Sequence, residues 1–473
     1  MIGNTMKEII YAIFLSFFLC GLCGNAEAKK KKEVKKAIKR EVQTPYDKLF
    51  KGKKAFTVNG LMKMHLMAGK VYAEFPIELL NRDLALTSSI EDISDNGEGV
   101  VGQFAGRVNQ FRFTLQDSML QARLVRRYGV KNTGMGKNAD QIIERSNTPG
   151  IFQSYKILAY TPDKKAVVVD MTELFLESSR LTNPFPSYAG NSLYGFVQRI
   201  HKFQSQRSEL LGICGNDNSM SVHCNLGFNV DRLVLGSFMQ AKDVPVSVTV
   251  NKILMLLPED PMRPRLADSR IGVNAIIQTE LPDVCQGIKT YYITKRWRIE
   301  PVDEIRYKQG EMVDVKKPIV FYIDTLMPDS WIKYVKAGAE AWNAAFEKIG
   351  LRNVVRTELF PKDSSFDAGD IHNSVIRYAP SWMYYPQYSM HTDPRTGEIL
   401  NASVYLPANV ASYFYTSRTE ETMAVDPSVR KARLSEEQFG EMFKAKMMQA
   451  IGRCLGLTDN YAASSVYPVD SLR

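Results

Sequence analysis

The chain has 473 residues, of which 45% are hydrophobic and 24% charged. This composition is typical of a globular protein and excludes a largely disordered one, and the length suggests two or three domains. The formal net charge of +10 does not indicate a nucleic-acid partner, because much of the excess lies in residues 29–40, with eight basic residues and one acid. Such a run is typical of a solvated tail, so we expect no nucleic acid to bind.

Residues 6–28 have the pattern of a secretory signal. Met6-Lys7 precedes an apolar core from Ile9 to Leu22, and Ala26-Glu27-Ala28 is a small-residue cleavage site. The core is too short for a spanning helix, and no later stretch is long and apolar enough to cross a membrane. We therefore expect an exported protein (periplasmic, cell-envelope or secreted) without a transmembrane span after residues 1–28 are removed. Residues 29–45 are expected to form a basic linker.

Export places the remaining cysteines in an oxidising compartment. Cys214 and Cys224 are ten residues apart in a segment rich in Gly, Asn and Ser, and we expect a local disulfide between them. The spacing alone does not determine the connectivity. His223 lies next to Cys224, but two cysteines and one histidine are an incomplete metal-ligand set, which favours the disulfide.

Residues 46–315 are dominated by short segments rich in β-branched and aromatic residues, which predict strands. They include 70–75, 109–115, 119–125, 165–170 and 246–250. No phosphate-binding glycine loop or nucleophile elbow occurs among them.

From residue 316 the predicted elements alternate: strand 318–324, helix 330–349, strands 353–359 and 374–378, then a turn at 393–397 leading into strand Ile399–Leu406. This order is typical of an α/β layer. We predict an α+β protein with a β-rich N-terminal domain at 46–315 and an α/β domain at 316–473.

The last predicted helix begins after Ser435, since Ser435-Glu-Glu-Gln438 has the form of a capping box, and it ends at Gly456. Apolar residues recur along it at helical spacing. One group of zinc peptidases builds its site on such a helix, with the motif H-E-x-x-H-x-x-G-x-x-H. Its three ligand positions are occupied here by Gln449, Arg453 and Asp459, and its base position by Ala450. Taken alone this pattern is weak, and a packing helix with a glycine cap is its commoner explanation.

Further segments, in the family's order, resemble the secreted bacterial zinc-dependent metalloproteases, which have a β-rich N-terminal region and a metzincin-like catalytic domain. These segments are Glu259–Asp268, Trp297–Pro301, Lys317–Asp324, Ala341–Gly350, Asp393–Ile399, Val425–Arg430 and Tyr467–Arg473. The resemblance extends from about residue 46 to residue 473. It implies a zincin-like fold for the α/β domain, with zinc as the family's cofactor.

The chain departs from the family at the motif itself. Arginine is permanently charged and cannot ligate a cation, so Arg453 removes one ligand. Ala450 has no proton acceptor to act as the base. The family also continues through a methionine turn, whereas this sequence stops at Arg473. We therefore expect a degenerate, C-terminally truncated catalytic domain that takes no cofactor.

Two kinds of function follow from these expectations. The first is a non-catalytic pseudoprotease that binds an extended peptide or protein by strand addition, along a predicted edge strand with Ile399, Asn401, Ser403 and Tyr405. An edge that binds nothing explains this strand equally well. The second is an active peptidase, with a remodelled site or one completed by another polypeptide. The product of an interrupted gene is a further alternative. Substrate and oligomeric state stay open.

Overall fold

The computed structural model describes residues 43–125, 130–132, 134, 137–178, 181–185, 197–235, 238–282, 287–362, 366–379, 381, 385–431, 433–466, 468 and 470. The predicted signal peptide and most of the basic linker lie outside these residues. Residues 44–473 form one compact unit. The division into two domains at residue 316 stays a prediction. Residues 44–315 are called the N-terminal half below, and residues 316–473 the C-terminal half.

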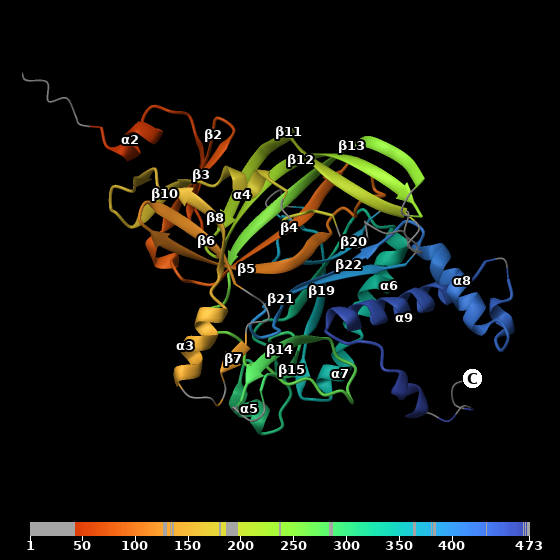
Figure 1. Ribbon diagram of the computed structural model, residues 1–473. Coiled ribbons are helices and arrows are strands. Elements are labelled where there is room, and N and C mark those ends of the chain that lie inside the picture. The colour runs from red at the N-terminus through yellow and green to blue at the C-terminus, as the bar shows by residue number, and fades with distance from the viewer. Residues whose placement is uncertain are drawn as a thin grey trace, which may run out of the picture. The chain divides into compact units, whose positions relative to one another are not determined.

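Two antiparallel sheets make up most of the N-terminal half (Figure 1). The five-stranded sheet has the order β1 (Phe56–Val58), β2 (Lys63–Met67), β3 (Lys70–Pro76), β10 (Ala166–Asp170) and β9 (Ala159–Tyr160). The seven-stranded sheet has the order β11 (Val197–Asn216), β12 (Ser219–Val234), β13 (Phe238–Leu256), β4 (Leu84–Ile93), β5 (Phe104–Gln116), β6 (Met119–Leu124) and β8 (Gly150–Lys156).

The core of the N-terminal half lies between these two sheets. Val71, Ala73 and Phe75 on β3 pack in one cluster with Phe111 and Phe113 on β5, all nearly inaccessible to water. The Phe75 and Phe113 ring centroids are 4.7 Å apart. Alternate residues of each strand are therefore buried between the sheets, which is the usual way that antiparallel sheets form a core.

Smaller elements connect the sheets and lead into the C-terminal half. A three-stranded sheet joins β15 (Lys289–Thr294), β14 (Ala275–Leu281) and β7 (Val130–Asn132), and a two-stranded one joins β16 (Val313–Asp314) and β18 (Leu351–Arg352). The shorter helices are α2 (Pro45–Phe50), α3 (Lys137–Ser146), α4 (Thr172–Leu176) and α5 (Glu304–Lys308).

The C-terminal half is built on a five-stranded mixed sheet. Its order is β19 (Val355–Leu359), β17 (Ile319–Ile323), β20 (Ser374–Tyr378), β22 (Ile399–Leu406) and β21 (Gln387–Thr392). The first four strands are parallel, and β21 pairs antiparallel with β22. Its helices are α6 (Asp329–Glu340), α7 (Asn343–Glu347), α8 (Val410–Thr422) and α9 (Glu436–Cys454). The helix predicted at 330–349 is thus divided into α6 and α7. The predicted α+β class and the β-rich N-terminal region are confirmed.

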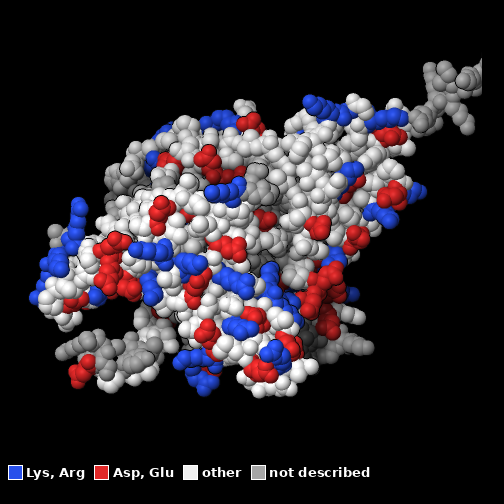
Figure 2. Space-filling model, turned by 180° about the vertical axis from the view of Figure 1, so that it is seen from behind, with Lys and Arg blue, Asp and Glu red and all other residues white. Residues whose placement is uncertain are grey.

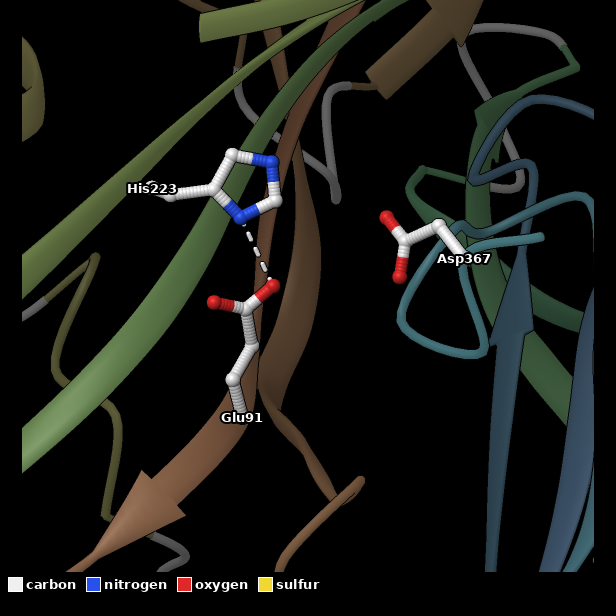
Figure 3. A group of neighbouring side chains, drawn as sticks. All are labelled: Glu91, His223 and Asp367. Carbon is white, nitrogen blue, oxygen red and sulfur yellow. Dashed lines mark hydrogen bonds and ion pairs between the residues drawn. The ribbon is translucent and has the colours of Figure 1, made fainter. Parts of the chain in front are cut away.

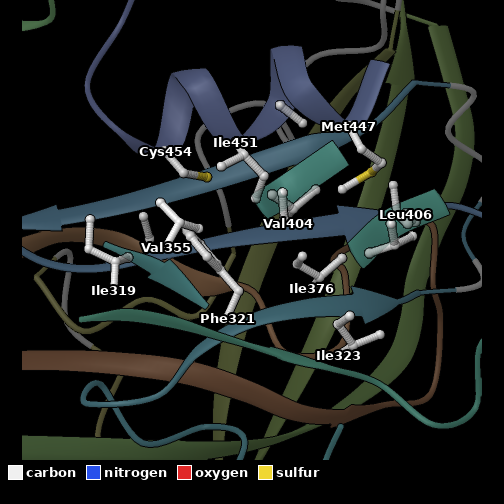
Figure 4. Close-up of a cluster of buried hydrophobic side chains, with 14 of the residues drawn as sticks. Ile319, Phe321, Ile323, Val355, Ile376, Val404, Leu406, Met447, Ile451 and Cys454 are labelled. Atoms are coloured by element: carbon white, nitrogen blue, oxygen red, sulfur yellow. The ribbon is translucent and has the colours of Figure 1, made fainter. Parts of the chain in front are cut away.

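Helix α9 packs its apolar face on this sheet (Figure 4). Met447, Ile451 and Cys454 point from the helix toward Val404 and Phe321, and all five side chains are fully buried. The Gly338 position on α6 permits close packing with α9, since a Cβ there would lie 2.7 Å from Lys444 O and from Met447 Cβ.

Both ends of α9 agree with the sequence prediction. Ser435 and Gln438 form a reciprocal capping box at the beginning. At the other end, Leu457 N–H donates to Gly452 O and Gly456 N–H to Arg453 O, each at 3.0 Å, which is the pattern of a Schellman motif. Gly456 has φ +101° and a Cβ there would lie 2.5 Å from Lys295 O, so the position requires glycine.

The prediction that residues 399–406 form an edge strand is wrong. β22 lies between β20 and β21, so its backbone is paired on both sides. Ile399 packs in the core beneath α9. Leu400 forms a bulge after Ile399, so Asn401, Ser403 and Tyr405 lie on the face opposite Val404, and they are also buried. An extended peptide therefore has no access to this strand, and the edge belongs to β21.

The predicted Cys214–Cys224 disulfide is also absent, because both thiols are free. The segment is the hairpin of β11 and β12, in which Cys214 is opposite Ser221 and Cys224 is opposite Leu210. Cys224 is buried, whereas Cys214 is exposed. Cys224 is three residues along β12 from Ser221, the partner of Cys214, which corresponds to about 10 Å along the strand. This distance is beyond the reach of a disulfide.

Charges of both signs are interspersed on the face shown in Figure 2. Among the described residues, no helix has the length and apolar character needed to cross a membrane.

Candidate functional site

Three of the four motif positions lie at one cavity. Gln449, Ala450 and Arg453 of α9 all line a cavity of about 530 Å³. Gln449 and Arg453 are four residues apart and therefore share a face of the helix. Asp459 follows after the turn at Gly456, which leads the chain back toward Arg453. The helix thus places Gln449 and Arg453 on one face, and the chain after the glycine turn brings Asp459 to Arg453.

Arg453 and Asp459 form an ion pair at this place. The Nη2 of Arg453 donates to both carboxylate oxygens of Asp459, at 2.8 and 2.9 Å. The guanidinium carbon also lies 5.7 Å from the ring centroid of Tyr388 on β21, a cation–π distance. Hydrogen bonding to Asp459 raises the pKa of Arg453 above its usual range. Arg453 therefore ties α9 to the following loop and to the edge strand.

The ion pair makes a small contribution to stability. The side chains of Arg453 and Asp459 are 28% and 47% exposed, so water screens their attraction. We expect Arg453→Ala to lower the free energy of unfolding by less than about 1 kcal/mol. Urea denaturation of the variant and the wild type measures this difference. A loss of 3 kcal/mol or more (roughly the cost of breaking a buried pair) would contradict it.

Tyrosine and glutamine side chains complete the cavity. Tyr385, Gln387 and Tyr388 come from β21 and the residues before it, and Tyr413 comes from α8. Gln103, from the N-terminal half, also lines the cavity. The neighbouring Gly102 is held in place by Tyr405, whose hydroxyl donates to Gly102 O at 2.9 Å. Tyr405 is thus a buried support for one wall of the cavity, and not a peptide contact.

The edge strand β21 borders this cavity. It is the terminal strand of its sheet, with β22 on one side. Tyr388 is 42% exposed, whereas His391 and Thr392 are buried. Sequence reasoning missed β21 as a strand, although Tyr388 and Thr392 favour a strand and the turn at 393–397 follows directly, a pattern that favours a β-hairpin.

These side chains do not fit a catalytic zinc ion. Arg453 brings a positive charge to one ligand position and already occupies the carboxylate of Asp459. Gln449 offers only an amide oxygen, and Ala450 no acceptor atom. A catalytic zinc requires three protein donors and a general base that activates its water. The donor set here supplies neither, so no hydrolytic step at this cavity can be derived from zinc.

Comparison with protein-family models matches two parts of the chain. Residues 102–302 match a domain of unknown function (DUF5117), and residues 431–473 match a family described as Met-zincin. No curated protein and no solved structure gave a match. The second match contains α9, its glycine turn and the four motif positions Gln449, Ala450, Arg453 and Asp459. Residues 431–473 are therefore a metzincin-like region of the kind that belongs to metallopeptidases.

Proposed function

We propose that the protein is an exported pseudoprotease that binds extended polypeptide without hydrolysing it. The observation that carries this proposal is the ion pair that Arg453, in the wall of the cavity, forms with Asp459. The pair occupies two ligand positions of the metzincin-like motif, one on α9 and one after its glycine turn, and the two charges satisfy each other. On this proposal the chain lacks the ligands and the base of a catalytic zinc site but has a cavity beside Gln449, Ala450 and Arg453 that can accept a peptide side chain. Export rests on the secretory pattern of residues 6–28.

The edge strand and the cavity supply the means of binding. A peptide pairing with β21 would use backbone hydrogen bonds, which require no metal ion. Its side chains would alternate between the surface and the cavity, where Tyr385, Tyr388 and Tyr413 offer aromatic contacts. Tyrosine provides large contact area at a low cost in side-chain entropy, which suits variable peptide sequences.

A binding and cleavage assay with fluorescein-labelled casein tests this function. We expect saturable binding by fluorescence anisotropy and intact casein on a gel, both in buffer and with added zinc. Tyr388→Ala should weaken binding at least about fivefold, equivalent to roughly 1 kcal/mol, because the variant loses an exposed aromatic contact beside the cavity.

Tyr160→Ala is the matched control. Tyr160 is 49% exposed on β9, in a different sheet. This variant should bind casein as the wild type does. Equal losses in the two variants would refute the assignment to β21. Chelator-sensitive cleavage of casein would refute the non-catalytic function.

A further inference from the structure

Three side chains that are far apart in the sequence converge at the contact between the two halves of the chain. Glu91 comes from β4, His223 from β12 and Asp367 from the turn before β20 (Figure 3). One imidazole nitrogen and one oxygen of each carboxylate lie within 4.8 Å of one another. His223 Nδ1 is 2.7 Å from Glu91 Oε1, and the Asp367 carboxylate points toward the same space.

A β-bulge directs Glu91 to this place. Ile90 is opposite Val250 and Asp92 is opposite Thr249, which leaves Glu91 as an extra residue without a partner in the register. On the neighbouring strands, His223 and Asn251 are opposite one another and share the face that Asp367 approaches. Bulges often re-aim a side chain next to a functional site.

Buried groups hold Asp367 in position. Its Oδ1 accepts from Gly369 N–H at 2.7 Å, and its Oδ2 accepts from the Asn251 amide at 3.0 Å. Asn251 is fully buried, and its Oδ1 has no hydrogen-bond partner among the described residues. This unpaired acceptor belongs to the same amide group that donates to the Asp367 carboxylate. Carboxylates that ligate metals are typically oriented by such hydrogen bonds.

The electrostatics also favour a cation. Burial and the neighbouring Glu91 carboxylate raise the pKa of Asp367, while the hydrogen bond from Gly369 opposes this shift. The hydrogen bond with Glu91 raises the pKa of His223. Burial, Asp367 and Glu91 together raise the pKa of the Cys214 thiol. Two carboxylates beside a single imidazole thus create a negative field in a half-buried place.

We propose that Glu91, His223 and Asp367 bind a divalent transition-metal ion that joins the two halves of the chain. Ligands at about 2.0–2.2 Å from zinc in a tetrahedral site are roughly 3.3–3.6 Å apart, so only small side-chain movements are needed. One nitrogen and two oxygen donors suit Zn²⁺ or Mn²⁺, whereas Mg²⁺ favours oxygen ligands alone. The ion would link β4 and β12 to the turn at Asp367, and its role would be structural.

Calorimetric titration of the chelator-treated protein with ZnCl2, MnCl2 and MgCl2 tests this site. We expect one Zn²⁺ or Mn²⁺ per chain to bind, and Mg²⁺ to bind at least about tenfold more weakly. The melting temperature should rise by about 3 °C when the ion exceeds its Kd about 100-fold. His223→Gln and Asp367→Asn should each weaken binding by about 100-fold or more and abolish the rise.

His372→Gln is the matched control. His372 and Asp370 form another histidine–carboxylate pair, at 2.8 Å, close to Asp367 in the sequence. This variant should bind the ion as the wild type does, and so should Cys214→Ser. The metal-dependent rise in melting temperature is compared within each variant, so a variant that is merely less stable remains informative. Equal binding by the wild type and His223→Gln, or a loss confined to either control, would overturn the proposal.

Discussion

Phe443→Ala is expected to lower the free energy of unfolding by about 3–5 kcal/mol, a typical loss for a buried phenylalanine. Phe443 is fully buried in the core between α9 and the mixed sheet. Its ring centroid lies 5.1 Å from that of Trp331 and 5.2 Å from that of Phe414. Removing the ring leaves a cavity among α6, α8 and α9 that these neighbours fill only in part. The shift of the urea denaturation curve measures the loss.

Phe56→Ala provides the control for the same chemical change. Phe56 is 61% exposed on β1, so its removal should change the free energy of unfolding by no more than about 0.5 kcal/mol. A Phe443→Ala variant as stable as the wild type would show that α9 does not pack on the sheet as described. The ligand positions on α9 would then also lose their assigned placement.

Lys252→Met should remove a large part of the dependence of stability on pH in the alkaline range. Lys252 is fully buried on β13, and its Nζ donates to Glu177 O at 2.5 Å. Burial lowers its pKa from 10.5 to about 8. Between pH 8 and 10.5 the unfolded chain therefore holds a proton that the folded chain has lost, so stability rises with pH. The free energy of unfolding of the wild type, relative to that of Lys252→Met, should increase by about 2–3 kcal/mol from pH 7 to pH 10.

Urea denaturation at a series of pH values measures this difference. The other lysines are present in both proteins, so their contributions to the pH dependence of the free energy of unfolding cancel in the comparison. Lys156→Met serves as the control, because Lys156 is exposed on β8 and its variant should follow the wild-type curve. A difference between wild type and Lys252→Met that stays constant from pH 7 to pH 10 would mean that Lys252 does not lose its proton in this range.

Local sequence signals predicted local structure well. Ser435 and Gln438 indicated where α9 begins, and Gly456 indicated where it ends, because each acts on hydrogen bonds of its own turn. The spacing of Gln449 and Arg453 likewise placed both on one face of a helix. These parts of the candidate site depend on residues that are close in the sequence.

Pairing between distant segments could not be predicted in this way. The strand Ile399–Leu406 shows no local sign of lying between β20 and β21. The hairpin of β11 and β12 separates Cys214 from Cys224, although a loop would allow them to meet. Glu91, His223 and Asp367 have no common motif spacing, since three different elements bring them together. The strand order, the separation of the cysteines and this cluster all depend on strand register and on how distant elements dock. Neither composition nor periodicity encodes register or docking directly.

The contacts between the halves also set an order of events during synthesis. Ser89 on β4 donates to Gly369 O across 280 residues, and Tyr405 donates to Gly102 O across 303 residues. At about 5–20 residues per second, a ribosome needs roughly 15–60 s to supply the later partner. During this time β4 and β5 have emerged without the segments that cover them. Such non-local pairing is slow to form, and the uncovered strands are prone to aggregate until the C-terminal half arrives.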